Sequence, residues 1–476
     1  MKRLLPLFAL LILFSCKKDI TKITSPPKPE PPVASRTDDQ KLKDSVYYYY
    51  KEQSYWTESI GTYDPIFSFT DKYNSYDNVL TALMQQTPVH AGYNGPIDRF
   101  SRIEDISSES SSRAKRADLA DGYGIYLTFV RVNGTVYLYA YFIEGGSPAE
   151  SKGMRRGDRI IEVNGNTDMS ENNTDFIQAA LDGSKLKLKV LRDAKEVTVP
   201  EMTYTSYDIN PVTKDSVLTV NGKKYGYLAL SSFEEMTDDG GNSTAMLNDI
   251  DQAFSNFENN NVSELILDFR VNTGGYVSTA IYLADKIINS SGNNKLMLSY
   301  DMNKNMQKYK TGRGAQFADV MFSKRTQNLE VKKVVFLVTD YTASAAEIVI
   351  SVLKPYMDVK LVAEKSATYG KPVGFFRQDI MDKIGLWAAS FKIINASGYS
   401  DYWDGIPADI RNVTDNVTLD FGNTKENMIA AALNYLSTGS LTASARVARS
   451  STNLNSSFNT PLKRINNLRE RDLIKN

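Results

Sequence analysis

The sequence has one histidine, His90, and one cysteine, Cys16, among its 476 residues. A Ser-His-Asp hydrolase needs a histidine beside its serine, and a structural zinc site usually needs several Cys or His ligands. Both classes are therefore nearly excluded, and no disulfide can form within these residues. Because the sequence shows no metal-binding or nucleotide-binding signature, we expect no cofactor.

The sequence also lacks an excess of either charge. Lys+Arg and Asp+Glu are both 56, so the formal net charge is zero and no global basic bias indicates a nucleic-acid partner. Charged residues make up 24% and hydrophobic residues 42%, which is typical of soluble globular domains. A chain of this length suggests roughly three domains.

Long apolar runs are also scarce, and the one at the start ends at the single cysteine. "MKR" is positively charged, and "LLPLFALLILF" after it is too short to span a bilayer comfortably. The following "LFSC" resembles the lipobox of bacterial lipoproteins, in which the cysteine is lipidated. We therefore predict a lipoprotein signal peptide at residues 1–16, with lipidation at Cys16; a plain signal peptide or an apolar anchor is the alternative. The protein would be exported and attached to a membrane of the bacterial envelope by lipid, in the outer membrane or at the cell surface rather than in the inner membrane.

Composition changes along the chain indicate where the outer segments lie. Residues 17–40 are Pro-rich and charged, which predicts an extended tether. Residues 41–112 contain "DSVYYYYKEQSYW" and "DNVLTALMQQ", which predict a small helical domain followed by a polar linker. Residues 441–476 are rich in Ser, Asn and Arg, which predicts a flexible tail.

Alternating apolar and polar residues begin near residue 113 and predict strands in "GIYLTFVRV", "TVYLYAYFI" and "LKLKVLRD". Between them, "SPAESKGMRRGDRIIEVNG" closely resembles a pattern of PDZ domains, so residues 113–200 are interpreted as one. The resemblance implies that a glycine loop holds the C-terminal carboxylate of a bound polypeptide through backbone N–H groups. That loop would consist of Gly122, Tyr123, Gly124 and Ile125.

Residues 201–440 alternate buried strands with amphipathic helices, which predicts an α/β layer with parallel strands. The strand "VVFLVT" runs into "DYTASAAEIVISVL", which places Ser344 at a strand–helix turn. A serine at such a turn is usually a helix cap when nothing else is known.

Four segments in this region resemble peptidase family S41, the C-terminal processing peptidases, in the family's own order. They are "DFRVNTGG" (268–275), "TASAAEI" (342–348), "EKSATYGKPVGFF" (364–376) and "GIPADI" (405–410). The resemblance implies a crotonase/ClpP-like α/β/α catalytic core. The expected fold class is thus multidomain α/β, with a small helical N-terminal domain, a β-rich PDZ domain and that core.

The same resemblance implies catalysis by a Ser-Lys dyad, which suits a chain with one histidine. Ser344 would be the nucleophile and Lys371 its base. A lysine has an ordinary pKa near 10.4, so it must be desolvated to act as a base near pH 7. The oxyanion would be bound by the N–H of Ala345 and by a glycine N–H, from Gly274 or Gly275.

Two departures from the family pattern concern the lysine. Lys371 follows Ser344 by 27 residues, slightly more than is often seen, and Phe375 stands where the family often has a glutamine. Gln378 lies three residues further on and is a candidate substitute. Outside the motifs, Asp268 is expected to organise a strand end, Arg270 to pair with an acid, Glu347 to favour its helix N-terminus, and His90 to be a loop or cap residue.

The sequence therefore predicts a serine endopeptidase that cleaves unfolded or C-terminally exposed polypeptides in the envelope. One alternative is a non-catalytic, PDZ-containing lipoprotein that binds peptide tails, if Phe375 and the longer spacing disable the dyad. Another is a crotonase-type enzyme acting on acyl-CoA, which the predicted export signal disfavours. The residues do not indicate an oligomeric state.

Overall fold

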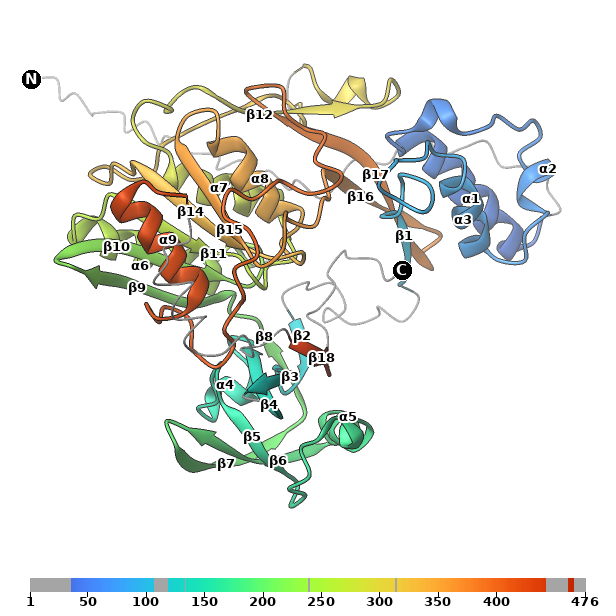
Figure 1. Cartoon of the computed structure of the whole chain (residues 1–476). Helices are drawn as coiled ribbons and strands as arrows, with labels where there is room; N and C mark the ends of the chain where they lie inside the picture. The colour runs from blue at the N-terminus through green and yellow to red at the C-terminus, as the bar shows by residue number, and fades with distance from the viewer. Residues whose placement is uncertain are drawn as a thin grey trace, which may run out of the picture.

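The structure is a computed structural model of the chain, and it describes residues 36–106, 119–132, 134–238, 240–312, 315–441 and 461–465. Figure 1 shows a helical domain, a β-rich domain and a larger α/β domain that lies between them. The predicted signal peptide, Cys16 and residues 17–35 of the predicted tether lie outside the described residues.

The helical domain begins earlier than predicted. It contains α1 (Asp38–Gln53), η1 (Thr57–Ser59), α2 (Phe67–Thr70) and α3 (Tyr76–Met84). The prediction that the tether continues to residue 40 is wrong, because a capping box starts α1 at residue 38. The Thr37 N–H donates to Gln40 Oε1 (3.0 Å), and the Gln40 N–H donates to Thr37 Oγ1 (3.3 Å).

The helical domain shares its core with a second sheet of the α/β domain. That sheet contains β1 (Arg102–Asp105), β12 (Leu296–Met302), β13 (Val320–Met321), β16 (Val373–Ile380) and β17 (Ile384–Asn395). Tyr47 and Tyr50 of α1 are buried in the same cluster as Leu386 of β17. Tyr47 and Tyr50 of the tyrosine run therefore contribute to packing. A short helix, η3 (Gln307–Tyr309), lies between β12 and β13.

The β-rich domain contains a six-stranded sheet of order β18-β3-β4-β5-β6-β7, in which neighbouring strands are antiparallel. Its strands are β3 (Ile125–Val132), β4 (Thr135–Ile143), β5 (Arg159–Val163), β6 (Lys185–Arg192), β7 (Lys195–Thr203) and β18 (Pro461–Arg464). The other elements are α4 (Pro148–Ser151), η2 (Glu171–Asn173), α5 (Thr174–Leu181) and a ribbon of β2 (Leu119–Gly122) with β8 (Thr205–Asp208).

Strand β18 corrects one prediction. Residues 461–464 were expected to belong to a flexible tail, yet they pair with β3. The short segment carries no strong strand signal of its own, and it is the open edge of β3 that supplies the hydrogen-bonding partner.

The α/β domain is built on a five-stranded sheet of order β15-β14-β11-β10-β9. Its strands are β9 (Val212–Val220), β10 (Lys223–Leu230), β11 (Glu264–Asp268), β14 (Lys333–Val338) and β15 (Asp358–Ala363), and only β9 is antiparallel to its neighbour. Alternate residues face opposite layers, so Leu265 and Leu267 pack on one side and Ile266 packs on the other.

Helices cover both faces of this sheet. The first face packs against α6 (Ala245–Asn259), α7 (Val277–Ile287) and α8 (Ala345–Leu353), and the second packs against α9 (Asn427–Thr438), which lies in front of the sheet in Figure 1. The predicted multidomain α/β fold is confirmed.

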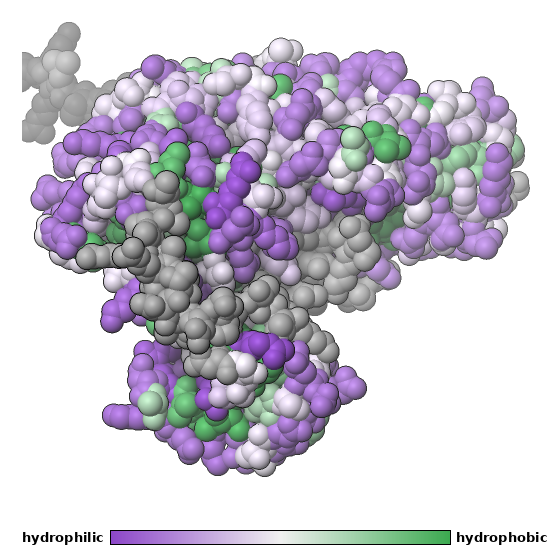
Figure 2. Space-filling view, viewed as in Figure 1, coloured by the Kyte–Doolittle hydropathy of each residue, from purple (hydrophilic) through white to green (hydrophobic). Residues whose placement is uncertain are grey.

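The face of the molecule shown in Figure 2 is mostly hydrophilic, with smaller hydrophobic areas between the purple side chains. In the part of the chain that the structure describes, no helix is long and apolar enough to cross a membrane.

Candidate active site

Ser344 lies at a strained turn between the buried strand β14 and helix α8. Its backbone has φ 54° and ψ −117°, a conformation that non-glycine residues rarely adopt and that costs about 1–3 kcal/mol. Strain of this kind displays a nucleophilic serine at the strand–helix turn of α/β-hydrolases. Two hydrogen bonds fix the turn to the segment that follows β11. Thr342 Oγ1 donates to the Phe269 carbonyl (2.8 Å), and the Ala343 N–H donates to the Asn272 carbonyl (3.2 Å).

Lys371 lies in the loop between β15 and β16 and is only 1% exposed. Its backbone N–H donates to Glu347 Oε2 (2.9 Å), and the backbone N–H of Ser344 donates to the same oxygen (2.9 Å). The two backbone nitrogens therefore lie within two hydrogen-bond lengths of each other. The Tyr369 N–H also donates to the Thr342 carbonyl (2.9 Å), so the two predicted dyad segments are joined twice.

Glu347 accepts the Ser344 N–H at the start of α8, as expected for an acid at a helix N-terminus, but sequence reasoning missed its bonds to the lysine loop. It is fully buried, and its other oxygen accepts hydrogen bonds from Thr368 Oγ1 and from the Gly370 N–H (2.8 Å). Burial raises the pKa of Glu347 to about 6 from its ordinary value of 4.5, and the four hydrogen bonds oppose that rise. An acid among the otherwise apolar residues of "AAEIVISVL" was a usable signal, because a buried carboxylate must have partners.

The glycine segment that follows β11 lies against Ser344. A Cβ atom on Gly274, whose φ is 111°, would come within 2.8 Å of Ser344 Cβ and 3.1 Å of the Ala343 carbonyl, so only glycine permits this approach. The Gly274 N–H donates to Asn272 Oδ1 (2.9 Å). The N–H groups of Gly275 and Ala345 have no hydrogen-bond acceptor among the residues that the structure describes.

The surroundings of Lys371 differ from the usual family pattern. Its Nζ lies 4.6 Å from the centroid of the Phe375 ring. Gln378 does not take the place of the missing glutamine, because its side chain accepts a hydrogen bond from Gln53 Nε2 (3.2 Å) and donates to the Asp379 carbonyl (3.0 Å). It therefore lies against the helical domain.

His90 has a partner, although the sequence offered no obvious one. Its Nε2 lies 3.0 Å from Asp404 Oδ1, in the loop just before the "GIPADI" segment. That contact ties the helical domain to the loop beside Gly370, because a Cβ on Gly370 would come within 2.2 Å of the Trp403 carbonyl. The two partners lie far apart in the sequence.

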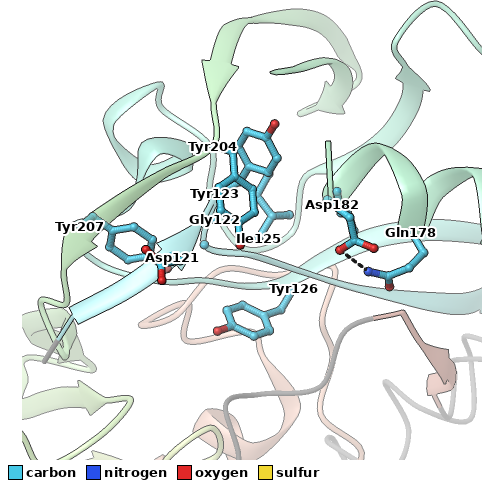
Figure 3. Close-up of a pocket in the computed structure, with 11 residues that line it drawn as sticks. Asp121, Gly122, Tyr123, Ile125, Tyr126, Gln178, Asp182, Tyr204 and Tyr207 are labelled. Atoms are coloured by element: carbon cyan, nitrogen blue, oxygen red, sulfur yellow. Dashed lines mark hydrogen bonds between the residues drawn. The ribbon is translucent and has the colours of Figure 1, made fainter. Parts of the chain in front are cut away.

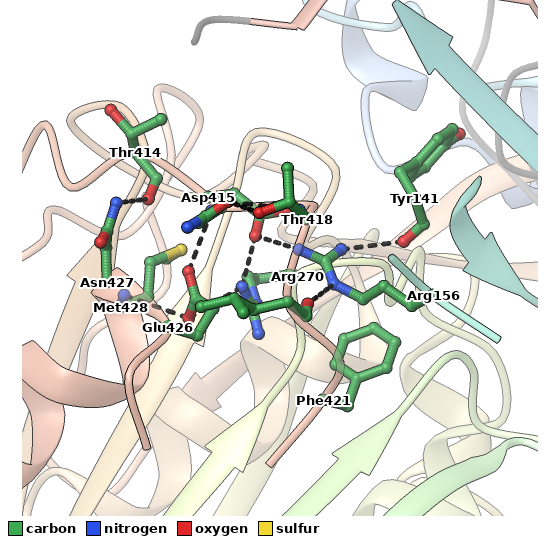
Figure 4. A network of polar contacts seen from close by, with 12 residues as sticks. Tyr141, Arg156, Arg270, Thr414, Asp415, Thr418, Phe421, Glu426, Asn427 and Met428 are labelled. Carbon is green, nitrogen blue, oxygen red and sulfur yellow. Dashed lines mark hydrogen bonds and ion pairs between the residues drawn. The ribbon is translucent and has the colours of Figure 1, made fainter. Parts of the chain in front are cut away.

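A buried ionic network surrounds Arg270, which precedes the glycine segment in the sequence (Figure 4). Arg270 pairs with Asp268 (2.6 Å), Asp415 (2.5 Å) and Glu426 (3.2 Å). Asp268 also accepts a hydrogen bond from the Tyr227 hydroxyl (2.6 Å). The expected roles of Asp268 at the strand end and of Arg270 as an ion-pair partner are confirmed.

Arg156 of the β-rich domain completes this network. Its guanidinium pairs with Asp415 (2.5 Å) and donates to the carbonyls of Leu419 (3.0 Å) and Tyr141 (2.8 Å). Arg156 therefore connects the β-rich domain to the loop of Asp415, whose carboxylate also pairs with Arg270.

The predicted carboxylate-binding loop lines a pocket between β3 and the end of α5 (Figure 3). Gln178 and Asp182 of the helix side face the loop, and a hydrogen bond of 3.0 Å joins them. The pocket lining consists of Asp121, Gly122, Tyr123, Gly124, Ile125, Tyr126, Gln178, Leu181, Asp182, Tyr204 and Tyr207.

Sequence comparisons agree with these two domains. Residues 143–192 match the PDZ domain, and residues 224–412 match peptidase family S41. Residues 224–412 are thus similar to the S41 peptidases. The PDZ match precedes this peptidase match, and the peptidase match includes both dyad segments.

Two curated relatives are similar to this chain. The carboxy-terminal processing protease CtpA of Bacillus subtilis (strain 168) is 28% identical over 237 residues, which cover 48% of this chain and 42% of the relative. Carboxyl-terminal-processing peptidase 1, chloroplastic, of Arabidopsis thaliana is 25% identical over 328 residues, covering 66% of this chain and 60% of the relative. The chain thus spans about half the length of these curated relatives.

A crystal structure assigned to the S41 proteases, from Bacteroides fragilis NCTC 9343, has the same fold. It aligns with a TM-score of 0.65 and 23% identity, and covers 87% of this chain and 100% of its own. Within the described residues, no group of three or more His, Cys, Asp or Glu side chains is arranged to hold a metal ion.

Proposed function

We propose that this protein is a serine endopeptidase that cleaves unfolded or C-terminally exposed polypeptides with Ser344 as nucleophile and Lys371 as base. The observation that carries the proposal is the Glu347 oxygen that accepts the N–H groups of both residues (2.9 Å each). This oxygen joins the strained turn at Ser344 to the loop of Lys371. The segment at Gly274 lies beside them, so close to Ser344 that no residue larger than glycine fits there.

The proposed reaction has two steps. Ser344 Oγ attacks the substrate carbonyl while its proton passes to the neutral Lys371 amine, and that proton then leaves with the amine product. Water attacks the resulting acyl-enzyme while Lys371 takes its proton, and Lys371 then returns that proton to Ser344 Oγ as the acid product leaves. Lys371 is 1% exposed, and loss of hydration disfavours a charged ammonium.

The oxyanion formed in each step needs donors. We assign the N–H groups of Ala345 and Gly275, because neither has an acceptor within the described part of the chain. Gly274 has a different role, since its N–H is engaged by Asn272 Oδ1. The positive end of the α8 dipole adds to the stabilisation at Ala345.

Cleavage of an unfolded model protein, reduced and alkylated casein, tests the dyad. The enzyme lacks residues 1–35, and Ser344→Ala and Lys371→Ala are each expected to lower kcat/KM by about three orders of magnitude or more. Ser366→Ala and Lys365→Ala are matched controls: both residues are exposed, and Lys365 pairs with Asp340 at the surface. The controls should cleave as the parent does. Full activity of Lys371→Ala would refute the base assignment.

The second candidate is a non-catalytic PDZ lipoprotein that binds peptide tails. The position of Lys371 Nζ over the Phe375 ring favours it, because an aromatic face stabilises the ammonium form. If the parent cleaves nothing between pH 6 and pH 10, with varied C-terminal tails on the substrate, this candidate replaces the peptidase.

We also propose that the protein is exported and anchored in the bacterial envelope by lipid at Cys16. The support is the sequence at residues 1–16, where a short apolar run ends at "LFSC". Metabolic labelling with a clickable fatty acid should mark the parent, whereas Cys16→Ser should be unlabelled and lost from the membrane fraction. Labelling of Cys16→Ser would contradict the anchor.

A further inference from the structure

The free edge of the PDZ sheet is occupied by the chain's own 461–465 segment. Strands β3 to β7 form a complete antiparallel sheet from one continuous part of the chain, and β3 begins directly after the predicted carboxylate-binding loop. β18 comes from beyond the peptidase domain and adds a sixth strand at β3. An extended peptide binds a PDZ domain by adding a strand in this manner.

The hydrogen-bonding register extends along half of β3. Lys463 lies opposite Phe129 and Arg464 lies opposite Thr128. The Ile465 N–H then donates to the Leu127 carbonyl (3.0 Å), and Ile465 packs against the PDZ core. The contact is thus formed by backbone pairing together with an apolar side chain.

The 461–465 segment runs along β3 in the same direction as a peptide ligand of a PDZ domain would. As the segment runs from residue 461 to residue 465, its partners on β3 run from Val130 back to Leu127. It therefore advances toward the loop and pocket at residues 122–126 (Figure 3). A peptide whose carboxylate is to reach that loop must run the same way.

The charge of the pocket lining indicates which peptide tails the groove would prefer. The pocket lining includes two carboxylates, Asp121 and Asp182, and no lysine, arginine or histidine. The sequence "PLKRI" of the segment contains two basic residues and no acidic one. Opposite charge favours a basic peptide over an acidic one at this end of the sheet.

We propose that the 461–465 segment is a tethered ligand of the PDZ groove, and that a basic polypeptide tail must displace it to bind. A tethered ligand acts at an effective concentration on the order of millimolar. Weak tails are therefore excluded, and only a tail that outcompetes the segment is captured. Delivery of tails to the site of the proposed peptidase would rest on the proposed function, whereas occupancy of the groove does not.

Peptide binding in trans tests this occupancy. The protein is the chain without residues 1–35, and the probe is a fluorescein-labelled peptide with the sequence of residues 456–465, "SSFNTPLKRI". Ile465→Pro removes the N–H that donates to Leu127. Ile465→Val keeps that N–H and an apolar side chain, and it is the matched control.

Fluorescence anisotropy is expected to show binding at least tenfold tighter to Ile465→Pro than to the parent or to Ile465→Val. Equal affinity for all three proteins, or no binding to any, would overturn the proposal. A second probe with both basic residues replaced, "SSFNTPLEEI", should bind the proline variant more weakly. Equal binding of the two probes would overturn the preference for basic tails.

Hydrogen exchange gives a readout that needs neither a ligand nor catalysis. In the parent, amides of β3 and the Ile465 amide should be protected, and Ile465→Pro should accelerate exchange across residues 125–132 while residues 185–192 of β6 stay unchanged. A parent in which the Ile465 amide exchanges as fast as in the free peptide would refute the tethered strand, whatever the enzyme assay shows.

Discussion

The Glu347 carboxylate explains how two distant loops hold one geometry. Its Oε2 accepts two backbone N–H groups, from Ser344 and Lys371, and its Oε1 accepts from Gly370 and Thr368. All four neighbouring groups are hydrogen-bond donors, so this side chain must accept four hydrogen bonds. A carboxylate provides them, whereas an amide of the same shape has an NH2 group that would face donors.

Glu347→Gln should therefore make the position of Ser344 relative to Lys371 less fixed, although residue 347 does not itself contact the substrate. We expect kcat to fall about 10- to 100-fold with little change in KM, which is the effect of misplaced reacting groups rather than of lost binding. Glu347→Asp, which keeps the charge but shortens the reach, should recover part of the loss. A large change in KM with kcat unchanged would contradict the positioning role.

The raised pKa of Glu347 also predicts a pH dependence of stability. With a folded pKa of about 6 and an unfolded pKa of 4.5, the folded state binds more protons between these values, so the free energy of unfolding falls as pH rises through this window. The decrease amounts to about 2 kcal/mol and is complete above pH 6. Urea unfolding of the parent and of Glu347→Gln between pH 4.5 and 7 isolates this term as their difference, and a constant difference would contradict it.

At this scale the sequence predicted which segments lie together but not how they are held. Ser344, Lys371 and the glycine segment belong to short motifs, and each motif lies within a few residues of chain. The partners of Glu347, His90 and Gln378 come from other segments, and no local pattern encodes a hydrogen bond to Thr368, Asp404 or Gln53.

The turn between α4 and β5 is one of the elements that attach the PDZ domain to the peptidase domain. It presents Arg156, which is nearly fully buried between Asp415 and the Leu419 and Tyr141 carbonyls. Its neighbour Arg155 is exposed. Two adjacent arginines of one "MRRGD" turn therefore have opposite environments.

Arg156→Met should destabilise the chain by about 3–5 kcal/mol, because it leaves Asp415 buried with less positive charge beside it. Arg155→Met is the matched control and should change the free energy of unfolding by no more than about 0.5 kcal/mol. Urea denaturation followed by circular dichroism measures both variants. If the two variants behave alike, the network does not stabilise the domain contact.

Elements were predicted well where a residue pattern repeats. Alternation identified β3, β4 and β6, and buried apolar runs identified β11 and β14. The start of α1 and the existence of β18 escaped prediction for different reasons. The first depended on a capping box inside a polar stretch, and the second depended on a free sheet edge far away in the sequence.

At the scale of the whole molecule, the helical domain covers an apolar face of the second sheet. Ile380, Ile384 and Leu386 share one buried cluster with Val46 and Leu83 of the helices. Three domains could be predicted from composition, but this shared core could not. In the sequence, the helices and the strands of the second sheet each have an ordinary amphipathic pattern that does not indicate their partner.

Removing residues 1–106 should therefore expose that face and cause the chain to associate. Light scattering and binding of the dye ANS should both rise relative to the chain that begins at residue 36. Ile384→Thr with Leu386→Thr in the shortened chain should lower both signals, since it makes the uncovered face polar. A shortened chain that remains monomeric without these changes would show that the uncovered face does not cause association.

Strand β18 has one more consequence, for the protein in concentrated solution. An unpaired β-strand edge is a template on which other chains can add strands, and the 461–465 segment covers that edge of the PDZ sheet. When the segment leaves, the edge of one molecule becomes complementary to the segment of the next. Exchange of this strand between copies would link molecules into pairs or open chains, so the same five residues that close the groove also keep neighbouring proteins apart.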